Sequence, residues 1–313
     1  MEIDDLTLVV PVRERRNTLD NLIQYYSTLK CSKLIVDSSE KSLNSKWLTV
    51  FKKTGFTYVY VGPMDYWEKM YTCSSLVKTS YMVDNSDDDV CLQSGLKEAV
   101  YFLKNNPNYV SASGELYSFN EKHGCFPKHH KRFLAQLHND SPSDSPFKRT
   151  KDFMTKRPVS LNHSVWKTSI LQDFWKMMRN NPNLEGVALL ERVMMMYAMI
   201  RGNKKILPVL FQMKRIGGPR VYRMKGISKE VKGGRKLGTL LNNKALRPLG
   251  QVLAKETKKS EKRCTAFLEE VLYNHLQCRQ DSRRGWFIGE APSVDLCYDE
   301  EDIQRFKNIY GLK

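Results

Sequence analysis

Short apolar runs alternate with amphipathic stretches over the first 120 residues of the chain. Each run is nearly continuous in Val, Ile, Leu, Tyr or Phe, which is typical of strands that are buried on both faces. The runs predict strands at residues 6–12, 33–37, 56–62, 81–86 and 109–119. Residues 13–30 instead show apolar positions at helical spacing, and Asn17 or Thr18 suits the cap of that helix.

Helical spacing returns at residues 66–80 and 92–107. Residues 124–158 are rich in His, Lys, Ser and Pro and predict a long, mobile loop with one or two helical turns. The second half then predicts helices at 164–181 and 184–203, a closing strand at 204–214, and a mainly helical tail with glycine breaks at 217–218 and 233–234.

Strands that alternate with helices predict an α/β fold, in which a mostly parallel sheet is covered by helices on both faces. In such sheets ligands bind beyond the carboxyl ends of the strands. The segments that follow those ends here are residues 11–16, 37–39, 62–65 and 84–89. Each of them carries polar groups, so we expect a ligand site along this edge.

The composition fits a packed protein of 313 residues, with 41% hydrophobic and 11% aromatic residues, and argues against wholesale disorder. No apolar run approaches the roughly 20 residues that span a bilayer, and the opening MEIDDLTLVV lacks a signal-peptide pattern. The seven cysteines are scattered without a CxxC pair, so neither a disulfide framework nor a zinc knuckle is indicated. We therefore expect a cytoplasmic protein without a transmembrane segment.

The stretch YMVDNSDDDV, residues 81–90, concentrates aspartates at 84, 87, 88 and 89 in a chain of net charge +17. One explanation is an acidic turn that is exposed to solvent and binds nothing. The other is a metal site, because carboxylate oxygens bind Mg²⁺ and Mn²⁺. Asp87 and Asp89, two residues apart on a turn, can approach one ion, which favours the metal site.

The order of these parts resembles the GT-A fold of nucleotide-sugar glycosyltransferases, especially the family-two-like group, over about residues 5–215. VVPVRERRNTLDNLIQYY resembles that group's first strand and helix, LIVDSS its second-strand motif, and YMVDNSDDDV its fourth strand with the DxD motif. LLERVMMMYAMIRGNKKILP resembles the helix that carries the catalytic carboxylate. The resemblance implies a GT-A domain at 1–215, with a donor part at about 1–120 and an acceptor part at about 121–215, and a basic helical extension at 216–313.

The resemblance further implies a nucleotide-diphosphate sugar as donor and a divalent cation, Mn²⁺ or Mg²⁺, as cofactor. Guanidinium groups after the first strand suit diphosphate oxygens, and the carboxylate that ends the second strand would face a pyrimidine base. The donor-binding residues that follow are Pro11, Arg13, Arg16, Asp37 and Asp88. The metal ligands that follow are Asp87, Asp89 and His163.

Transfer to a hydroxyl needs a general base that takes the acceptor proton. In the resembled family this carboxylate lies about eleven residues before a glycine, and counting back from Gly202 places it at Glu191. Leu190 stands where the family has a neighbouring acid. Glu185 is the alternative base, and Glu191 could instead pair on the surface with Arg192. The resemblance implies an inverting enzyme.

Positive charge gathers between residues 214 and 263, where sixteen Lys and Arg stand against three Glu. Such a block indicates a polyanionic partner, although a solvated pair of basic helices would also explain it. Our hypothesis is a DNA acceptor with a hydroxymethylated pyrimidine, as in the phage-type DNA-modifying members of the resembled family. The residues expected to dock it are Arg235, Lys236, Lys258 and Lys259.

Two other functions remain open at this stage. The acceptor could be a surface polysaccharide or lipid-linked glycan, with the basic tail lying on an anionic membrane. The tail has no long amphipathic face with Trp or Phe for insertion, which favours DNA. The chain could also be a non-catalytic nucleic-acid-binding protein on a degenerate transferase fold, but the presence of Asp87, Asp89 and Glu191 argues against that.

Overall fold

The computed structural model describes residues 3–14, 18–119, 142–155, 163–181, 187–215, 243–281 and 299–312. The first half of the chain contains β1 (Leu6–Val12), α1 (Leu19–Tyr26), β2 (Ser32–Asp37), α2 (Ser45–Thr54), β3 (Phe56–Tyr60), α3 (Tyr66–Ser75), β4 (Tyr81–Asp84), β5 (Val90–Cys91), α4 (Gln93–Asn105) and β6 (Tyr109–Phe119). The second half contains α5 (Pro146–Thr155), β7 (Val165–Lys167), α6 (Thr168–Arg179), α7 (Val187–Arg201), β8 (Asn203–Arg215), α10 (Asn243–Thr257), α11 (Glu261–Asp281) and α12 (Glu300–Tyr310).

The described strands form one sheet in the order β3-β2-β1-β4-β7-β6-β8-β5. The first four are parallel, β7 runs antiparallel to β4 and β6, and β8 is parallel to β6. The register pairs Val12 with Asp37 and Val9 with Asp84, so the carboxyl ends of β1, β2 and β4 share one edge. The predicted α/β class with a mostly parallel sheet is confirmed.

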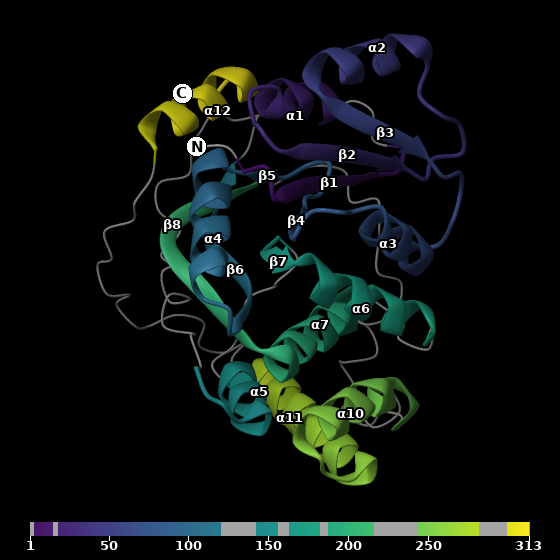
Figure 1. Ribbon diagram of the computed structural model, residues 1–313, viewed down its shortest axis with the longest axis vertical. Coiled ribbons are helices and arrows are strands. Elements are labelled where there is room, and N and C mark those ends of the chain that lie inside the picture. The colour runs from purple at the N-terminus through teal and green to yellow at the C-terminus, as the bar shows by residue number, and fades with distance from the viewer. Residues whose placement is uncertain are drawn as a thin grey trace.

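Helices cover both faces of the sheet (Figure 1). On one face α1, α4 and α12 join a hydrophobic cluster that includes Leu8 and Val10 of β1. On the other face α3, α6 and α7 join a second cluster that includes Val9. All three β1 side chains are fully buried. A strand in the middle of such a sheet has no polar face, and this explains the continuous apolar run in the sequence.

α7 lies beneath the second face and is anchored at its carboxyl end by α5. The buried guanidinium of Arg149 donates to the carbonyl oxygens of Met199 at 2.8 Å and Ile200 at 3.1 Å. A cation at this end of a helix also interacts favourably with the helix dipole. The methionines at positions 194–196 are all buried in the core, so they serve packing.

The described helices of the basic tail are integrated with the rest of the molecule. α10 and α11 pack against α5 and α7 in the second cluster, and α12 packs against α1 in the first. The proposed domain boundary at residue 215 stays a prediction, because residues 216–242 lie outside the described part. Within the described ranges, no helix has both the length and the apolar character needed to cross a membrane.

α12 is fastened by a buried carboxylate. One oxygen of Asp302 accepts from the Tyr25 hydroxyl at 2.5 Å, and the other accepts from the backbone N–H and hydroxyl of Ser94, at 2.8 and 2.9 Å. Leu92 caps α4 without a side-chain hydrogen bond. Asp302 therefore supplies the acceptor that the start of α4 lacks.

Some local predictions differ from the structure. Val165–Lys167 is not the start of a helix but the strand β7, held between β4 and β6. α2 was not expected, since among its residues only Phe51 is buried and the apolar pattern is weak. Thr18, one of the two predicted caps, is the N-cap residue of α1, but its side chain makes no capping hydrogen bond; Asn17 lies outside the described residues.

Candidate functional site

The edge where β1, β2 and β4 end carries most of the residues expected to bind a donor. Pro11 lies in β1 and is half-buried, and Arg13 follows the strand directly. Asp37 ends β2, and Asp84 ends β4. Arg16 lies outside the described residues. Parallel pairing thus brings three separate segments together, as the sequence predicted.

Asp37 is fully buried and tightly held. One carboxylate oxygen accepts from the N–H and hydroxyl of Ser39, at 2.9 and 2.5 Å, and the other accepts from the Tyr58 hydroxyl at 2.7 Å. The Ser39 hydroxyl oxygen accepts from the N–H of Glu14 at 2.9 Å, which ties the loop after β1 to the loop after β2. A nucleotide base that hydrogen-bonds to Asp37 must therefore share this carboxylate with Ser39 and Tyr58 or replace one of them as donor.

The acidic turn after β4 is built around Asn85. This fully buried amide donates to the carbonyl oxygens of Ser86 and Asp89, both at 2.9 Å, and accepts from the Cys91 N–H at 3.1 Å. Asp87 and Asp89 are only 7% and 4% exposed. Buried carboxylates are costly unless they interact with partners or cations. The expectation that these two carboxylates are exposed to solvent is therefore wrong, and a ligand for the turn stays a prediction.

Asp89 is the best-connected carboxylate of the turn. One of its oxygens lies 3.4 Å from His163 Nε2 and accepts from Gln212 at 3.3 Å, while the other accepts from the Arg215 N–H at 3.0 Å. Burial raises the pKa of Asp89 and lowers the pKa of His163, and their mutual attraction opposes both shifts. The His163 Nδ1 atom lies 3.1 Å from the carbonyl oxygen of Asp84. Strand β8 and the loop that holds His163 thus converge on the single carboxylate of Asp89.

Asp84, at the end of β4, is influenced electrostatically by Lys69. Burial raises the pKa of Asp84 to about 7, and the ammonium of Lys69 opposes this shift. Lys69 belongs to α3 and is itself buried. The sequence offered no signal for Lys69, because a lysine in an amphipathic helix is usually solvated.

The residues of the turn fit part of a cation site. Among the described residues, no three His, Cys, Asp or Glu side chains are grouped closely enough to hold a metal ion. The Asp89–His163 pair supplies one carboxylate and one imidazole. Mg²⁺ at phosphate sites is commonly held by one or two carboxylates together with substrate phosphate oxygens and water. The predicted ligands Asp89 and His163 are thus brought together, whereas Asp88 accepts locally from the Ser86 hydroxyl at 2.6 Å.

Glu191 lies on α7 and is paired with its neighbour. Its carboxylate accepts from Arg192 at 3.2 Å, so the local ion pair that the sequence left open is present. The Glu191 side chain keeps 26% exposure. Glu185, the alternative base, lies outside the described residues.

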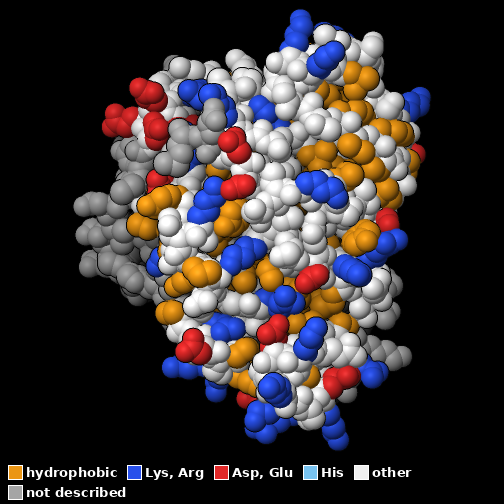
Figure 2. All heavy atoms as spheres, in the orientation of Figure 1, with side chains coloured by type: hydrophobic (Ala, Val, Ile, Leu, Met, Phe, Trp, Pro, Cys, Tyr) orange, Lys and Arg blue, Asp and Glu red, His pale blue; other side chains and the backbone are white. Residues whose placement is uncertain are grey.

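The predicted docking lysines lie away from the donor edge. Lys258 and Lys259 are exposed at the turn between α10 and α11, which Figure 1 places at the opposite end of the molecule from α1 and α2. Arg235 and Lys236 lie outside the described residues. On the face in Figure 2, basic and acidic side chains are interspersed near α10 and α11, and Arg247 pairs with Glu261 at 2.7 Å.

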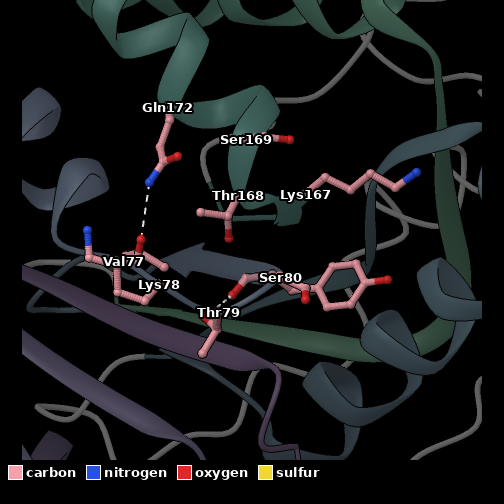
Figure 3. A pocket seen from close by; sticks show the side chains of 9 residues that line it. Val77, Lys78, Thr79, Ser80, Lys167, Thr168, Ser169 and Gln172 are labelled. Carbon is pink, nitrogen blue, oxygen red and sulfur yellow. Dashed lines mark hydrogen bonds between the residues drawn. The ribbon is translucent and has the colours of Figure 1, made fainter.

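A cavity of about 540 Å³ lies at the other end of β4. It is bordered by Val77–Tyr81 before and at the start of the strand, and by Lys167–Ser169 and Gln172 where β7 leads into α6 (Figure 3). None of the candidate donor, metal or catalytic residues lines it. The cavity is therefore separate from the acidic turn.

Comparison with known proteins supports the fold. No protein-family model and no curated protein sequence matches the chain. A solved structure of residues 1–349 of S. aureus TarS in complex with UDP-GlcNAc is similar with a TM-score of 0.52 and 11% identity, over 99% of this chain and 79% of that one. TarS 1–349 in complex with UDP gives 0.53 and 10%, over 92% and 76%. The chain has the GT-A glycosyltransferase fold.

Proposed function

We propose that the chain is a glycosyltransferase that uses a nucleotide-diphosphate sugar as donor. The observation that carries the proposal is the meeting of Asp37, the buried acidic turn and His163 at the carboxyl edge of a GT-A sheet. Ligands of such sheets bind at this edge. Because the similar TarS structures contain UDP-GlcNAc and UDP, the UDP-sugars are the first donors to test.

In this proposal the loops after β1 and β2 bind the nucleotide. Arg13 and Arg16 hold diphosphate oxygens, since a guanidinium can donate two parallel hydrogen bonds to a phosphate. Pro11 shapes the wall of the site, and Asp88 faces the sugar or its ribose. Asp37 recognises the base, and Ser39 and Tyr58 fix the direction of its carboxylate.

A divalent cation, Mn²⁺ or Mg²⁺, belongs to the proposal. Asp89 and His163 would hold it, with Asp87 as the further carboxylate of the turn. When bound, the cation neutralises charge that develops on the departing diphosphate. The fit rests on the buried Asp89–His163 pair, because two such side chains need only phosphate oxygens and water to complete a coordination shell.

Glu191 is proposed as the general base. It is a partly exposed carboxylate on α7, a helix whose carboxyl end is anchored by Arg149. Arg192 donates to Glu191 at 3.2 Å and orients its carboxylate. A base that deprotonates the acceptor hydroxyl for direct attack would give inversion at the anomeric carbon.

The acceptor is proposed to be DNA that carries a hydroxymethylated pyrimidine, and the charge of residues 214–263 supports it. Binding through phosphates should weaken with salt, with a log–log slope of roughly −0.9 per neutralised phosphate. Charge reversal at Arg235, Lys236, Lys258 and Lys259 should flatten the slope. A protein that ignores DNA at low salt but sediments with anionic vesicles would instead favour a surface or lipid-linked glycan.

The proposed function is tested by release of nucleoside diphosphate from a panel of nucleotide sugars, with water or candidate hydroxyl acceptors as the second substrate. We expect release from one donor class only, and we expect it to require Mn²⁺ or Mg²⁺. Asp89→Asn should abolish release, while the exposed Glu270→Gln should not change it. The absence of release from every donor, with folded protein and added cation, would reject the proposal.

A further inference from the structure

The cavity at the start of β4 is bordered by the open end of a helix. α6 begins at Thr168, and Lys167 precedes it without a side-chain capping bond. The Thr168 N–H donates to the carbonyl oxygen of Ser80 at 2.9 Å. The first N–H groups of an α-helix have no partner within the helix. Ser169 and Ile170, the next residues of α6, therefore bring their N–H groups to the end of the helix that borders the cavity.

Thr168 provides a second and independent sign of a missing ligand. Its side chain is 6% exposed, and its hydroxyl oxygen has no hydrogen-bond partner among the residues that the structure describes. Figure 3 shows this hydroxyl directed into the space between α6 and Ser80. A buried hydroxyl without a partner costs free energy comparable to a lost hydrogen bond. A ligand with acceptor oxygens would remove that cost.

The charges around the cavity favour a negatively charged ligand. Among the nine described residues that line it, none is acidic and two are lysines. Among the residues that the structure describes, the exposed Lys78 ammonium makes one long, 3.5 Å bond, to the Ser75 carbonyl oxygen, and it can turn towards a ligand. The Lys167 ammonium donates to the carbonyl oxygen of Pro107. It therefore adds positive electrostatic potential at the cavity but makes no direct contact with a ligand. The dipole of α6 adds partial positive charge at the same place.

We propose that the N-terminus of α6, with Thr168, Ser169 and Lys78, is a binding site for a phosphate-type oxyanion, separate from the donor site. Backbone N–H groups at a helix start, hydroxyls and a nearby ammonium are the donors that phosphate groups bind. The site lies at the amino end of β4, whereas the acidic turn follows its carboxyl end. A phosphate held here can belong to a free phosphate or monoester, or to a phosphodiester within a chain.

The test is a titration of the full chain with inorganic phosphate at constant ionic strength, followed by TROSY NMR of the Ser169 and Ile170 amides. We expect saturable shifts at these amides. Thr168→Val, which removes only the hydroxyl, and Lys78→Gln, at an exposed position, should each weaken binding by about tenfold, because a hydrogen bond to a charged group contributes on that order. Lys52→Gln on α2 is the matched control and should bind phosphate like the parent chain.

Dimethyl phosphate, a small diester, distinguishes a free phosphate or monoester from a phosphodiester within a chain. Binding as strong as that of inorganic phosphate supports a phosphodiester chain as the ligand, and binding of inorganic phosphate alone supports a free phosphate or monoester. The proposal is overturned if the Ser169 and Ile170 amides do not shift, or if Thr168→Val and Lys78→Gln bind as the control does. Because Lys78 is exposed, its variant tests the site even if Thr168→Val fails to fold.

Discussion

The buried carboxylate of Asp302 should contribute more to stability than any other polar group of α12. It accepts three hydrogen bonds, one from Tyr25 and two from Ser94, and all three cross more than 200 residues of sequence. Asp302→Ala leaves a buried phenol and the first N–H groups of α4 without their acceptor. The loss of a hydrogen bond to a charged group costs about 1.5–3 kcal/mol, and the loss of a helix cap costs about 1 kcal/mol.

These contributions overlap at Ser94, so we expect Asp302→Ala to lower the free energy of unfolding by about 3–5 kcal/mol. Asp302→Asn keeps one acceptor oxygen but places its amide NH₂ group against a donor. We expect this variant to lower the free energy of unfolding by about 2 kcal/mol. Tyr25→Phe removes one bond only and should cost about 1–2 kcal/mol. The exposed Glu301, one residue away on α12, provides the control Glu301→Gln, which should change stability by less than about 0.5 kcal/mol.

Urea unfolding followed by near-ultraviolet circular dichroism measures all four variants. A double-mutant cycle between Asp302 and Tyr25 should give a coupling energy of about 1–2 kcal/mol. The reasoning is refuted if Asp302→Ala loses no more stability than Glu301→Gln. It is also refuted if the effects of Asp302→Ala and Tyr25→Phe on the free energy of unfolding are additive, because the 2.5 Å hydrogen bond would then contribute nothing.

Three further predictions follow from other parts of the chain. Glu191→Gln should lower transfer by about 10²–10⁴-fold with little change in donor affinity, as expected for a lost general base, and unchanged turnover would refute its role. Burial raises the pKa of Glu115 from 4.5 to about 8, so folding takes up a proton and the free energy of unfolding falls as pH rises between these two values. Glu115→Met should remove up to about 1.4 kcal/mol per pH unit from this pH dependence, measured by urea unfolding at several pH values. An unchanged pH dependence would refute the prediction. Lys258 has a left-handed φ of 54°, so Lys258→Gly should raise stability by about 0.5 kcal/mol in thermal unfolding, and destabilisation would contradict this.

The inner strands of the donor half, β1, β2 and β4, could be predicted because they are buried on both faces. β1, for example, has its side chains in two different clusters, and only a continuous apolar run satisfies both. α2 escaped prediction since it buries little more than Phe51. β7 was assigned to a helix because three residues carry no period of their own, and their pairing with β4 and β6 depends on contacts distant in sequence.

The candidate site likewise has parts that the sequence predicts and parts that depend on contacts distant in sequence. The acidic turn and its place after a strand could be predicted from local sequence. His163 was predicted to join Asp89 at the cation site, but the partners of Asp89 on β8 could not be predicted. Gln212 and Arg215 reach it from β8, more than 120 residues away, because β8 pairs with β5 directly after the turn. Lys69 was missed because nothing in an amphipathic pattern marks a buried lysine.

The central claim, that the carboxyl edge of the sheet binds a nucleotide-diphosphate sugar, is tested most directly by calorimetric titration with UDP-sugars and related pyrimidine donors, in Mn²⁺ and in EDTA. The account predicts saturable binding of one donor class in Mn²⁺, its loss in EDTA, and its loss in the Asp89→Asn variant. Binding that persists in EDTA would contradict the assignment of Asp89 and His163 to a cation. Failure to bind any donor in Mn²⁺ would contradict the function itself.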